Sequence, residues 1–292
     1  MGILNVTPDS FSDGGRWNDV RTAVRHAFDM VDQGADIIDI GGESTRPNSL
    51  PVSSEEELSR LEPVLRELIP SIDVPVSVDT MKADVAERCI GLGADIVNDV
   101  NGLRGPGMVQ LCASTGVYAV IMHMNGMPRT MPSSMGGDFM EDIRGFLRER
   151  TSAALDAGMD RNRIILDPGI GFGKDPDENY RILNSSSFFS DGYPVLSASS
   201  RKRFLAVKYP GMDRDEASAE AAVAAARSGA RCGEDPPQTF RITPTAMTTA
   251  MTMMADPQKR YSFIFSDLRR SDSFFRHSSL QNSSPNGMGS PQ

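Results

Sequence analysis

Cysteine is scarce in this 292-residue chain and is not arranged for bridging or for binding metal. Cys89, Cys112 and Cys232 lie far apart and form no CxxC pair. A disulfide framework and a structural zinc site both need cysteines at characteristic spacings, so the sequence predicts neither. Isolated thiols are typical of proteins that work in a reducing compartment, and we therefore expect a cytoplasmic location.

Long apolar runs and an excess of basic residues are also missing. No window approaches the ~18 uncharged apolar residues of a membrane span, and the N-terminus lacks the basic and apolar regions of a signal peptide. We therefore expect no membrane partner. The formal net charge of −9 argues against general nucleic-acid binding. An anionic substrate would need a local cluster of basic residues within this negatively charged protein.

What the chain does contain is one layout, repeated at nearly even intervals. A short apolar segment ends in a polar side chain, passes through a loop rich in Asp, Ser, Pro or Gly, and leads into a stretch with apolar residues at helical spacing. The predicted strands cover residues 2–4, 35–40, 74–78, 95–97, 117–122, 163–166 and 194–198. Helices are predicted over residues 17–33, after 54, after 82, and over 107–115, 138–157, 177–184 and 214–228. A capping box of Ser54 with Glu57 is expected to start the second helix.

Seven strand-plus-helix units imply an α/β fold with a parallel sheet, and eight such units close a (β/α)8 barrel of TIM type. A doubly wound open sheet is the alternative. The barrel is favoured because polar groups follow every predicted strand, whereas an open sheet needs them only where its strand order reverses.

The pattern fails where an eighth unit should follow. After residue 230 the chain reads RCGEDPP, and two adjacent prolines argue against a central strand there. Residues 231–292 continue through a Thr- and Met-rich stretch into a Ser-, Asn- and Arg-rich end with no sustained period of 2 or 3.6. The sequence thus predicts a barrel domain over residues 1–230 whose eighth βα unit is absent or aberrant, followed by an atypical, mostly disordered tail over 231–292.

Seven motifs, in this order and spacing, resemble those of dihydropteroate synthase, the pterin-binding barrel enzyme of folate synthesis. They are residues 5–15 (NVTPDSFSDGG), 41–47 (GGESTRP), 77–80 (SVDT), 98–99 (ND), 122–124 (MHM), 167–174 (DPGIGFGK) and 200–202 (SRK). The first and sixth are the most specific, and together the motifs span residues 1 to about 230. Family members use Mg²⁺ and form dimers, so the resemblance implies a magnesium cofactor and a homodimer.

The resemblance implies that the pterin ring is held by residues at four strand ends. These are Asp79, Asn98, Asp167 and Lys202, with Met122 in the same pocket. The edge of a pterin alternates N–H donors with nitrogen and carbonyl acceptors. Carboxylates accept from the donors, an amide can do both, and a lysine donates to the carbonyl side.

Other residues are implied to serve the diphosphate and the second substrate. Asn5 resembles the family residue at the diphosphate–magnesium site, where it would be the protein ligand to Mg²⁺. Thr45 and Arg46 resemble the residues that meet the diphosphate and the aminobenzoate, and with Asn5 and Lys202 they form the implied catalytic set. A guanidinium suits such anions because its planar arrangement of N–H groups can donate two parallel hydrogen bonds to a carboxylate or phosphate.

The remaining implied residues lie in loops around the aminobenzoate. Phe172 resembles the apolar wall for its ring, and Arg203 follows the SRK motif. Asp9 and Asp13 lie in a loop that resembles the mobile first loop of the family, which closes over the substrates. His123 is expected to be a wall or supporting residue.

The implied reaction joins 6-hydroxymethyl-7,8-dihydropterin diphosphate to 4-aminobenzoate and releases diphosphate. A pterin-dependent methyltransferase of the same barrel family is one alternative, and the motifs at residues 5–15 and 200–202 favour the synthase. A non-catalytic or impaired pterin-binding chain is the other. The family closes its barrel with a strand that carries Arg-x-His, and no such sequence follows residue 230. We therefore expect reduced activity.

Overall fold

The computed structural model describes residues 1–7, 20–45 and 49–230. Within these ranges the chain forms one parallel sheet of six strands. They are β1 (Gly2–Asn5), β2 (Ile38–Gly41), β3 (Val76–Asp79), β4 (Ile96–Asp99), β5 (Tyr118–Met122) and β6 (Ile164–Asp167). The strands lie side by side in the order of the sequence, β1-β2-β3-β4-β5-β6. A doubly wound sheet would reverse its order near the middle, so the alternative of a doubly wound fold is wrong.

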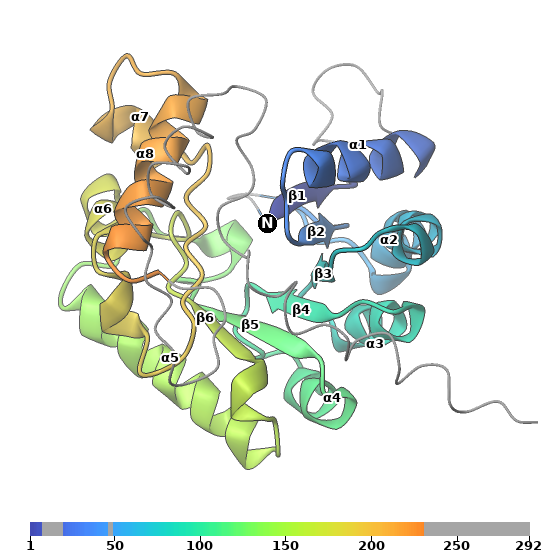
Figure 1. The fold of residues 1–292 in the computed structure, drawn as a ribbon. Coiled ribbons are helices and arrows are strands. Elements are labelled where there is room, and N and C mark those ends of the chain that lie inside the picture. Colours follow the sequence, from blue (N-terminus) through green and yellow to red (C-terminus); the bar gives the residue numbers. More distant parts are fainter. Residues whose placement is uncertain (8–19, 46–48, 231–292) are drawn as a thin grey trace, which may run out of the picture.

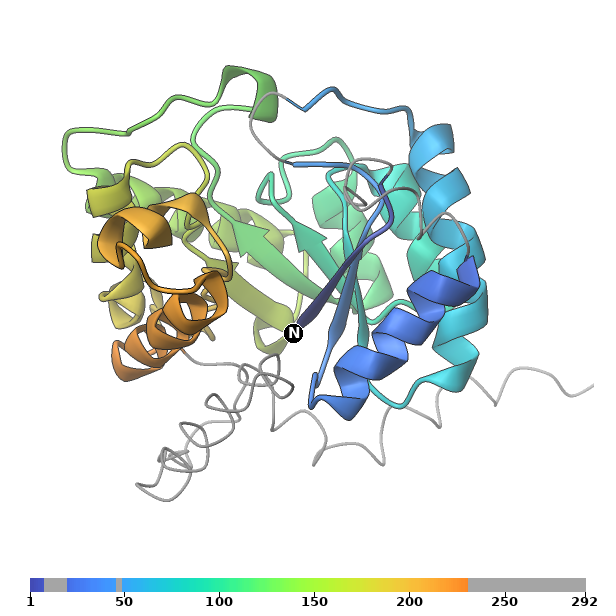
Figure 2. The same ribbon diagram turned by 90° about the horizontal axis from the view of Figure 1, so that it is seen from above.

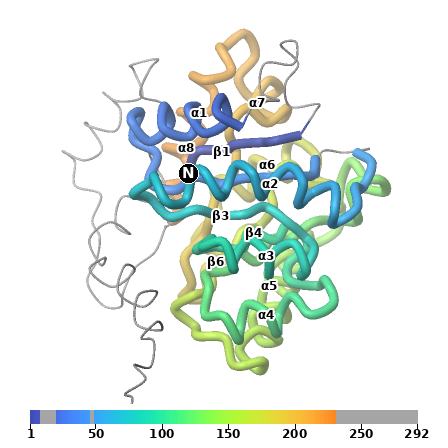
Figure 3. Tube along the Cα trace, turned by 90° about the vertical axis from the view of Figure 1, so that its right-hand side faces the viewer, coloured from blue at the N-terminus to red at the C-terminus, as the bar shows by residue number. Residues whose placement is uncertain are grey.

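Helices cover the outer face of the curved sheet (Figures 1 and 2). They are α1 (Val20–Asp32), α2 (Ser54–Leu68), α3 (Ala83–Leu92), α4 (Met108–Thr115), α5 (Phe139–Asp156), α6 (Pro176–Leu183), α7 (Arg203–Lys208) and α8 (Arg214–Arg227). Figure 3 shows α1 to α4 following one another along that face. In the described part of the chain, none of these helices has the length and apolarity needed to cross a membrane. The short helix α7 was not predicted.

The core has an outer and an inner layer, because successive residues of a strand point to opposite faces. The outer layer packs strands against helices, and around β1 and β2 it contains Leu4, Ile38 and Ile40 together with residues of α1, α2 and α3. The inner layer fills the barrel below the carboxyl ends of the strands. It is formed by Ile37, Ile96, Val120, Ile165 and Leu196.

The predicted seventh strand is much shorter than expected. Residues 194–198 contribute one parallel bridge, Leu166 with Val195. Leu166 donates its backbone N–H to the Pro194 oxygen at 2.9 Å, and Leu196 donates to the Leu166 oxygen at 2.8 Å. Pro194 has no N–H of its own to donate. In the ranges described, no strand borders the other edge of this segment, so nothing extends the ladder on that side.

The first strand has the matching open edge. Within the described ranges β1 pairs with β2 alone. Gly2 and Leu4 face the outer layer, so Ile3 faces the barrel interior, and yet Ile3 is 51% exposed. An inward-facing isoleucine in a closed barrel would be buried. The predicted disordered tail and aberrant eighth unit fall on residues 231–292, outside the described residues.

The start of α2 differs from the predicted capping box. Ser53, rather than Ser54, is the N-cap, and its Oγ accepts a hydrogen bond from the Glu56 N–H at 3.1 Å. This shift of one residue turns Glu57 away from the cap and onto the buried face of the helix. The expected pairing of Ser54 with Glu57 is therefore wrong.

Candidate active site at the carboxyl ends of the strands

Four strand ends form one row across the sheet. Asn5 is in register with Gly41, Gly41 with Asp79, and Asp79 with Asn98. Residues in register on parallel strands point to the same face, which here is the barrel interior. A Cβ added to Gly41 would lie 3.4 Å from Asn5 Oδ1 and 3.6 Å from Asp79 Oδ2. The glycine therefore leaves room for about one methyl group between the amide and the carboxylate.

Asp39 joins this row from within β2, although sequence reasoning missed it. Asn98 Nδ2 donates a hydrogen bond to Asp39 Oδ2 at 3.1 Å. The other oxygen, Asp39 Oδ1, and Asp79 Oδ1 are shielded from solvent and have no hydrogen-bond partner among the described residues. An unpaired buried acceptor costs about 1–3 kcal/mol, so these oxygens suit a ligand that brings N–H donors. The available signal was a carboxylate inside the otherwise apolar segment 37–40.

The two neighbouring carboxylates favour a bound proton. Burial raises the pKa of Asp39 above its ordinary value. Burial also raises the pKa of Asp79 well above its ordinary value, and the negative charge of Asp39 raises it further. Two buried carboxylates that repel each other titrate as a pair, with one proton held more tightly than usual.

Asp167 and Lys202 face this row from the other side of the barrel. Asp167 ends β6 in register with Met122, and its Oδ1 accepts the Gly169 N–H at 2.7 Å. Lys202 precedes α7, donates from Nζ to the Ile170 oxygen, and has Nζ 4.7 Å from the centre of the Phe172 ring. Burial lowers the pKa of Lys202 to about 8, although Asp167 and Asp79 act against this.

The charges of Asp79, Asp167 and Lys202 influence one another. Burial raises the pKa of Asp167, and the charge of Lys202 is the strongest opposing influence. Met122 packs with Val100 and Met124, and the half-buried Phe172 lies against the same cluster. The site thus combines the buried carboxylates of Asp39 and Asp167 and the half-buried one of Asp79 with an amide, a lysine and an apolar wall.

A buried lysine organises the loop that carries Phe172. Lys174 Nζ donates to the Gly169 oxygen at 2.8 Å and to the Phe172 oxygen at 3.0 Å, and lies 3.1 Å from His123 Nδ1. Burial lowers the pKa of Lys174 to about 7 and that of His123 to about 3. His123 is therefore neutral and supports the loop. Gly169 is required here, because a Cβ would lie 1.8 Å from the His123 oxygen.

The other predicted residues are less constrained by the structure. Thr45 is half-buried in the loop after β2, and Arg203 is exposed at the first position of α7. Asp9, Asp13 and Arg46 lie outside the described residues.

The donor chemistry around Asn5 suits a magnesium ion that is shared with a substrate. In the described ranges, no group of three or more His, Cys, Asp or Glu side chains could hold a metal ion. Mg²⁺, however, takes oxygen ligands and often uses only one or two from the protein, with phosphate oxygens and water supplying the rest. Asn5 Oδ1 borders the space above Gly41, on the side opposite Asp79. The residues present therefore fit the implied cofactor.

Comparison with known proteins identifies the family of this chain. The profile of the pterin binding enzyme family matches residues 1–233. The dihydropteroate synthase of Bacillus subtilis (strain 168) is 47% identical over 207 residues, which cover 70% of this chain and 70% of that enzyme. The structure of Xanthomonas albilineans dihydropteroate synthase in complex with 7,8-dihydropteroate is 40% identical, with a TM-score of 0.70, over 79% of this chain and 84% of that chain.

The structure of the Thermus thermophilus enzyme in complex with 4-aminobenzoate is 41% identical, with a TM-score of 0.69, over 78% of this chain and 84% of that chain. These structures confirm the predicted barrel class. The family, the fold and the motifs agree over the same part of the sequence. The chain therefore belongs to the pterin-binding enzymes, and among them to the dihydropteroate synthases.

Proposed function

We propose that the site at the strand ends joins 6-hydroxymethyl-7,8-dihydropterin diphosphate to 4-aminobenzoate, giving 7,8-dihydropteroate and diphosphate. The protein is accordingly a transferase of folate biosynthesis. The observation that carries the proposal is the pair of solvent-shielded oxygens of Asp39 and Asp79, which have no hydrogen-bond partner among the described residues and lie beside the amide of Asn98. The amino and ring N–H groups of a pterin supply the donors that these oxygens lack.

The pterin ring is held by Asp79, Asn98, Asp167 and Lys202, with Met122 as an apolar contact. Lys202 donates to the ring carbonyl, and the carboxylates accept from the ring donors. The buried negative charge also stabilises the positive charge that develops on the pterin methylene carbon as the diphosphate leaves. This second effect acts only in the transition state, and for that reason it accelerates the reaction.

The reaction needs no nucleophile from the protein. The amine lone pair of 4-aminobenzoate attacks the methylene carbon, the carbon–oxygen bond to diphosphate breaks, and the diphosphate leaves with the bonding electrons. The attacking nitrogen then loses a proton. Thr45 and Arg46 meet the diphosphate and the aminobenzoate, and Phe172 lies against the aminobenzoate ring. The family resemblance assigns Arg203, at the start of α7, to the same substrate, and it assigns Asp9 and Asp13 there too, which lie outside the described residues.

Magnesium is the implied cofactor, and Asn5 would hold it through Oδ1. When bound, Mg²⁺ neutralises negative charge on the departing diphosphate. The chain's own part is to place that amide oxygen at the end of β1, beside the row formed by Gly41 and Asp79.

Diphosphate release tests the proposed function directly. Release should require both substrates, and a reaction that lacks 4-aminobenzoate is the control. Binding of the pterin without any release would support the alternative of a non-catalytic pterin-binding chain and would contradict the proposal.

Pterin affinity is expected to fall as the pH rises through about 8. Burial lowers the pKa of Lys202 to about 8, so its charged form, which donates most strongly to the pterin carbonyl, is the form present at lower pH. Affinity is therefore full below this pKa and is lost above it. Calorimetric titration across this range checks the expectation, with Lys202→Met as the control. Ionisation of the pterin is common to both proteins, so equal pH dependence in the two would contradict the role of Lys202.

Gly41→Ala is expected to weaken binding of the pterin diphosphate about tenfold with little effect on folding. Its new methyl group would make contacts of 3.4–3.6 Å with Asn5 and Asp79, which the fold accommodates, but it would fill the space left for the ligand. Gly145→Ala is the control, because Gly145 lies within α5, away from the strand ends, and a Cβ there would have no heavy atom within 4 Å. It should leave both the affinity and the fold unchanged. Unchanged affinity in Gly41→Ala would show that the ligand does not use this space.

We also propose that the protein acts as a homodimer in the cytoplasm. Membership of the family supports the dimer, and the isolated cysteines support a reducing compartment. Analytical ultracentrifugation of the full chain tests the oligomeric state, and a monomer at micromolar concentration would contradict the dimer.

A further inference from the structure

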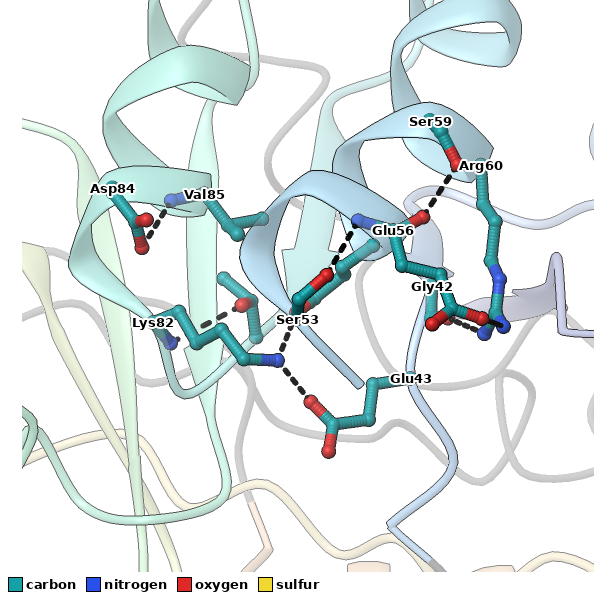
Figure 4. Close-up of polar contacts among 11 residues, drawn as sticks. Gly42, Glu43, Ser53, Glu56, Ser59, Arg60, Lys82, Asp84 and Val85 are labelled. Atoms are coloured by element: carbon teal, nitrogen blue, oxygen red, sulfur yellow. Dashed lines mark hydrogen bonds and ion pairs between the residues drawn. The ribbon is translucent and has the colours of Figure 1, made fainter. Parts of the chain in front are cut away.

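Lys82 is bound by carboxylates from two other elements. It is the residue before α3, three positions after Asp79 at the end of β3. Its Nζ lies 2.5 Å from Glu57 Oε2 on α2 and also donates to Glu43 Oε2 in the loop after β2. Figure 4 shows the Lys82 ammonium beside Glu43. One cation therefore ties together three segments that are distant in the sequence.

The same loop is held at the preceding residue. Arg60 Nη1 donates to the Gly42 oxygen at 2.7 Å (Figure 4). A Cβ on Gly42 would lie 3.1 Å from the Glu57 oxygen, so the loop backbone runs close against α2. The loop begins after Gly41, in the row of strand ends. Contacts with Arg60 and Lys82 hold it at Gly42 and Glu43, and Thr45 follows two residues later.

Lys82, Glu43 and Glu57 form a cluster of ion pairs in which both carboxylates are largely shielded from solvent. The Glu57 side chain is 0% exposed and that of Glu43 is 9% exposed. Burial lowers the pKa of Lys82, but the hydrogen bonds to Glu43 and Glu57 outweigh this and raise its pKa overall. Burial raises the pKa of Glu57, and the contact with Lys82 opposes that change. Removing the ammonium would leave two buried carboxylates facing each other, which then repel.

We propose that Lys82 is a positioning residue for substrate binding by the loop after β2. Through Glu43 it fixes the backbone that carries Thr45 relative to Asp79, so that the diphosphate and aminobenzoate contacts are aligned with the pterin pocket. This inference rests on the proposed function, because it assigns Thr45 to those ligands. Lys82 makes two links, one to Glu57 on α2 and one to Glu43. The second link reaches a loop residue that lies between Gly41 and Thr45.

The test compares Lys82→Met with Lys82→Arg in the full chain. Lys82→Met is expected to raise the KM for 4-aminobenzoate about tenfold, while calorimetric affinity for a pterin without diphosphate stays within about threefold. Lys82→Arg keeps the charge and should restore most of the KM. Arg88→Met is the matched control, since Arg88 is a cation within α3 that is paired with Glu62 at an exposed position. It should leave both quantities unchanged.

Glu43→Gln and Glu57→Gln separate positioning from stability. Glu43→Gln should raise the KM for 4-aminobenzoate, and Glu57→Gln should lower the melting temperature with little change in KM. A wild-type KM in Lys82→Met, or equal effects on KM of the two glutamate variants, would overturn the inference. Failure of the proposed function has a different signature, namely no diphosphate release by any variant or by the wild type. In that case the calorimetric affinity for inorganic diphosphate gives the same comparison, and equal affinity in wild type and Lys82→Met would overturn the inference.

Discussion

Asp79→Asn and Asp167→Asn will each weaken pterin binding by about 5- to 150-fold without loss of the fold. Each substitution replaces an acceptor that a pterin donor needs, and a donor left unpaired in a buried site costs about 1–3 kcal/mol. For Asp79 the melting temperature should stay the same or rise. Burial and the charge of Asp39 already raise the pKa of this carboxyl group, so the neutral amide removes an unfavourable charge.

Titration calorimetry with a pterin, together with thermal unfolding, checks this expectation. Asp84→Asn is the control, because Asp84 is an exposed carboxylate in the first turn of α3, away from the strand-end row. Unchanged affinity in both site variants would remove the assignment of the pterin pocket. Lower affinity with a large drop in melting temperature would show instead that these carboxylates hold the fold together.

Replacing residues 231–292 with an eighth βα unit that bears Arg-x-His will raise both the melting temperature and the rate of diphosphate release. In the described residues β1 pairs only with β2, and Val195 pairs only with β6. An eighth strand between these edges would satisfy their backbone groups and cover Ile3. The arginine and histidine would face the diphosphate, where a preorganised charged partner is typically worth about 10²–10³ in rate.

A second replacement, with Ala-x-Ala in place of Arg-x-His, separates the two effects. It should restore the melting temperature and leave the rate low, while pterin affinity changes little in either protein. If the natural chain already releases diphosphate at the rate of the version with Arg-x-His, the expectation is wrong. Residues 231–292 would then supply the missing groups.

The positions of the strand ends, and with them much of the site, could be predicted from local sequence. A strand buried on both faces is a short apolar run, and a polar residue that ends it must lie at the rim of a parallel barrel. Asp79, Asn98 and Asp167 were placed at strand ends in this way, and their roles are those that the family resemblance implies. The Gly-rich motif at residues 167–174 was recognised by its resemblance to the family, and Gly169, Gly171 and Gly173 adopt positive φ in the structure.

The tertiary structure alone revealed the partners of these residues. Asn98 donates a hydrogen bond to Asp39, which lies 59 residues earlier in the sequence, and Lys82 donates to Glu43, 39 residues earlier. Neither contact can be recognised from a short stretch of sequence. Glu57 fits a capping box by its spacing, yet a shift of one residue in the helix start buries it against Lys82. The seventh strand is reduced to one bridge because ladder length depends on a neighbouring strand as well as on the segment itself. Local sequence therefore determined which polar residues end the strands, because the ends of strands depend on the pattern of apolar residues and on the residue types in the turns. Their charge states and mutual orientation were decided by packing, because long-range contacts and desolvation exist only in the folded chain.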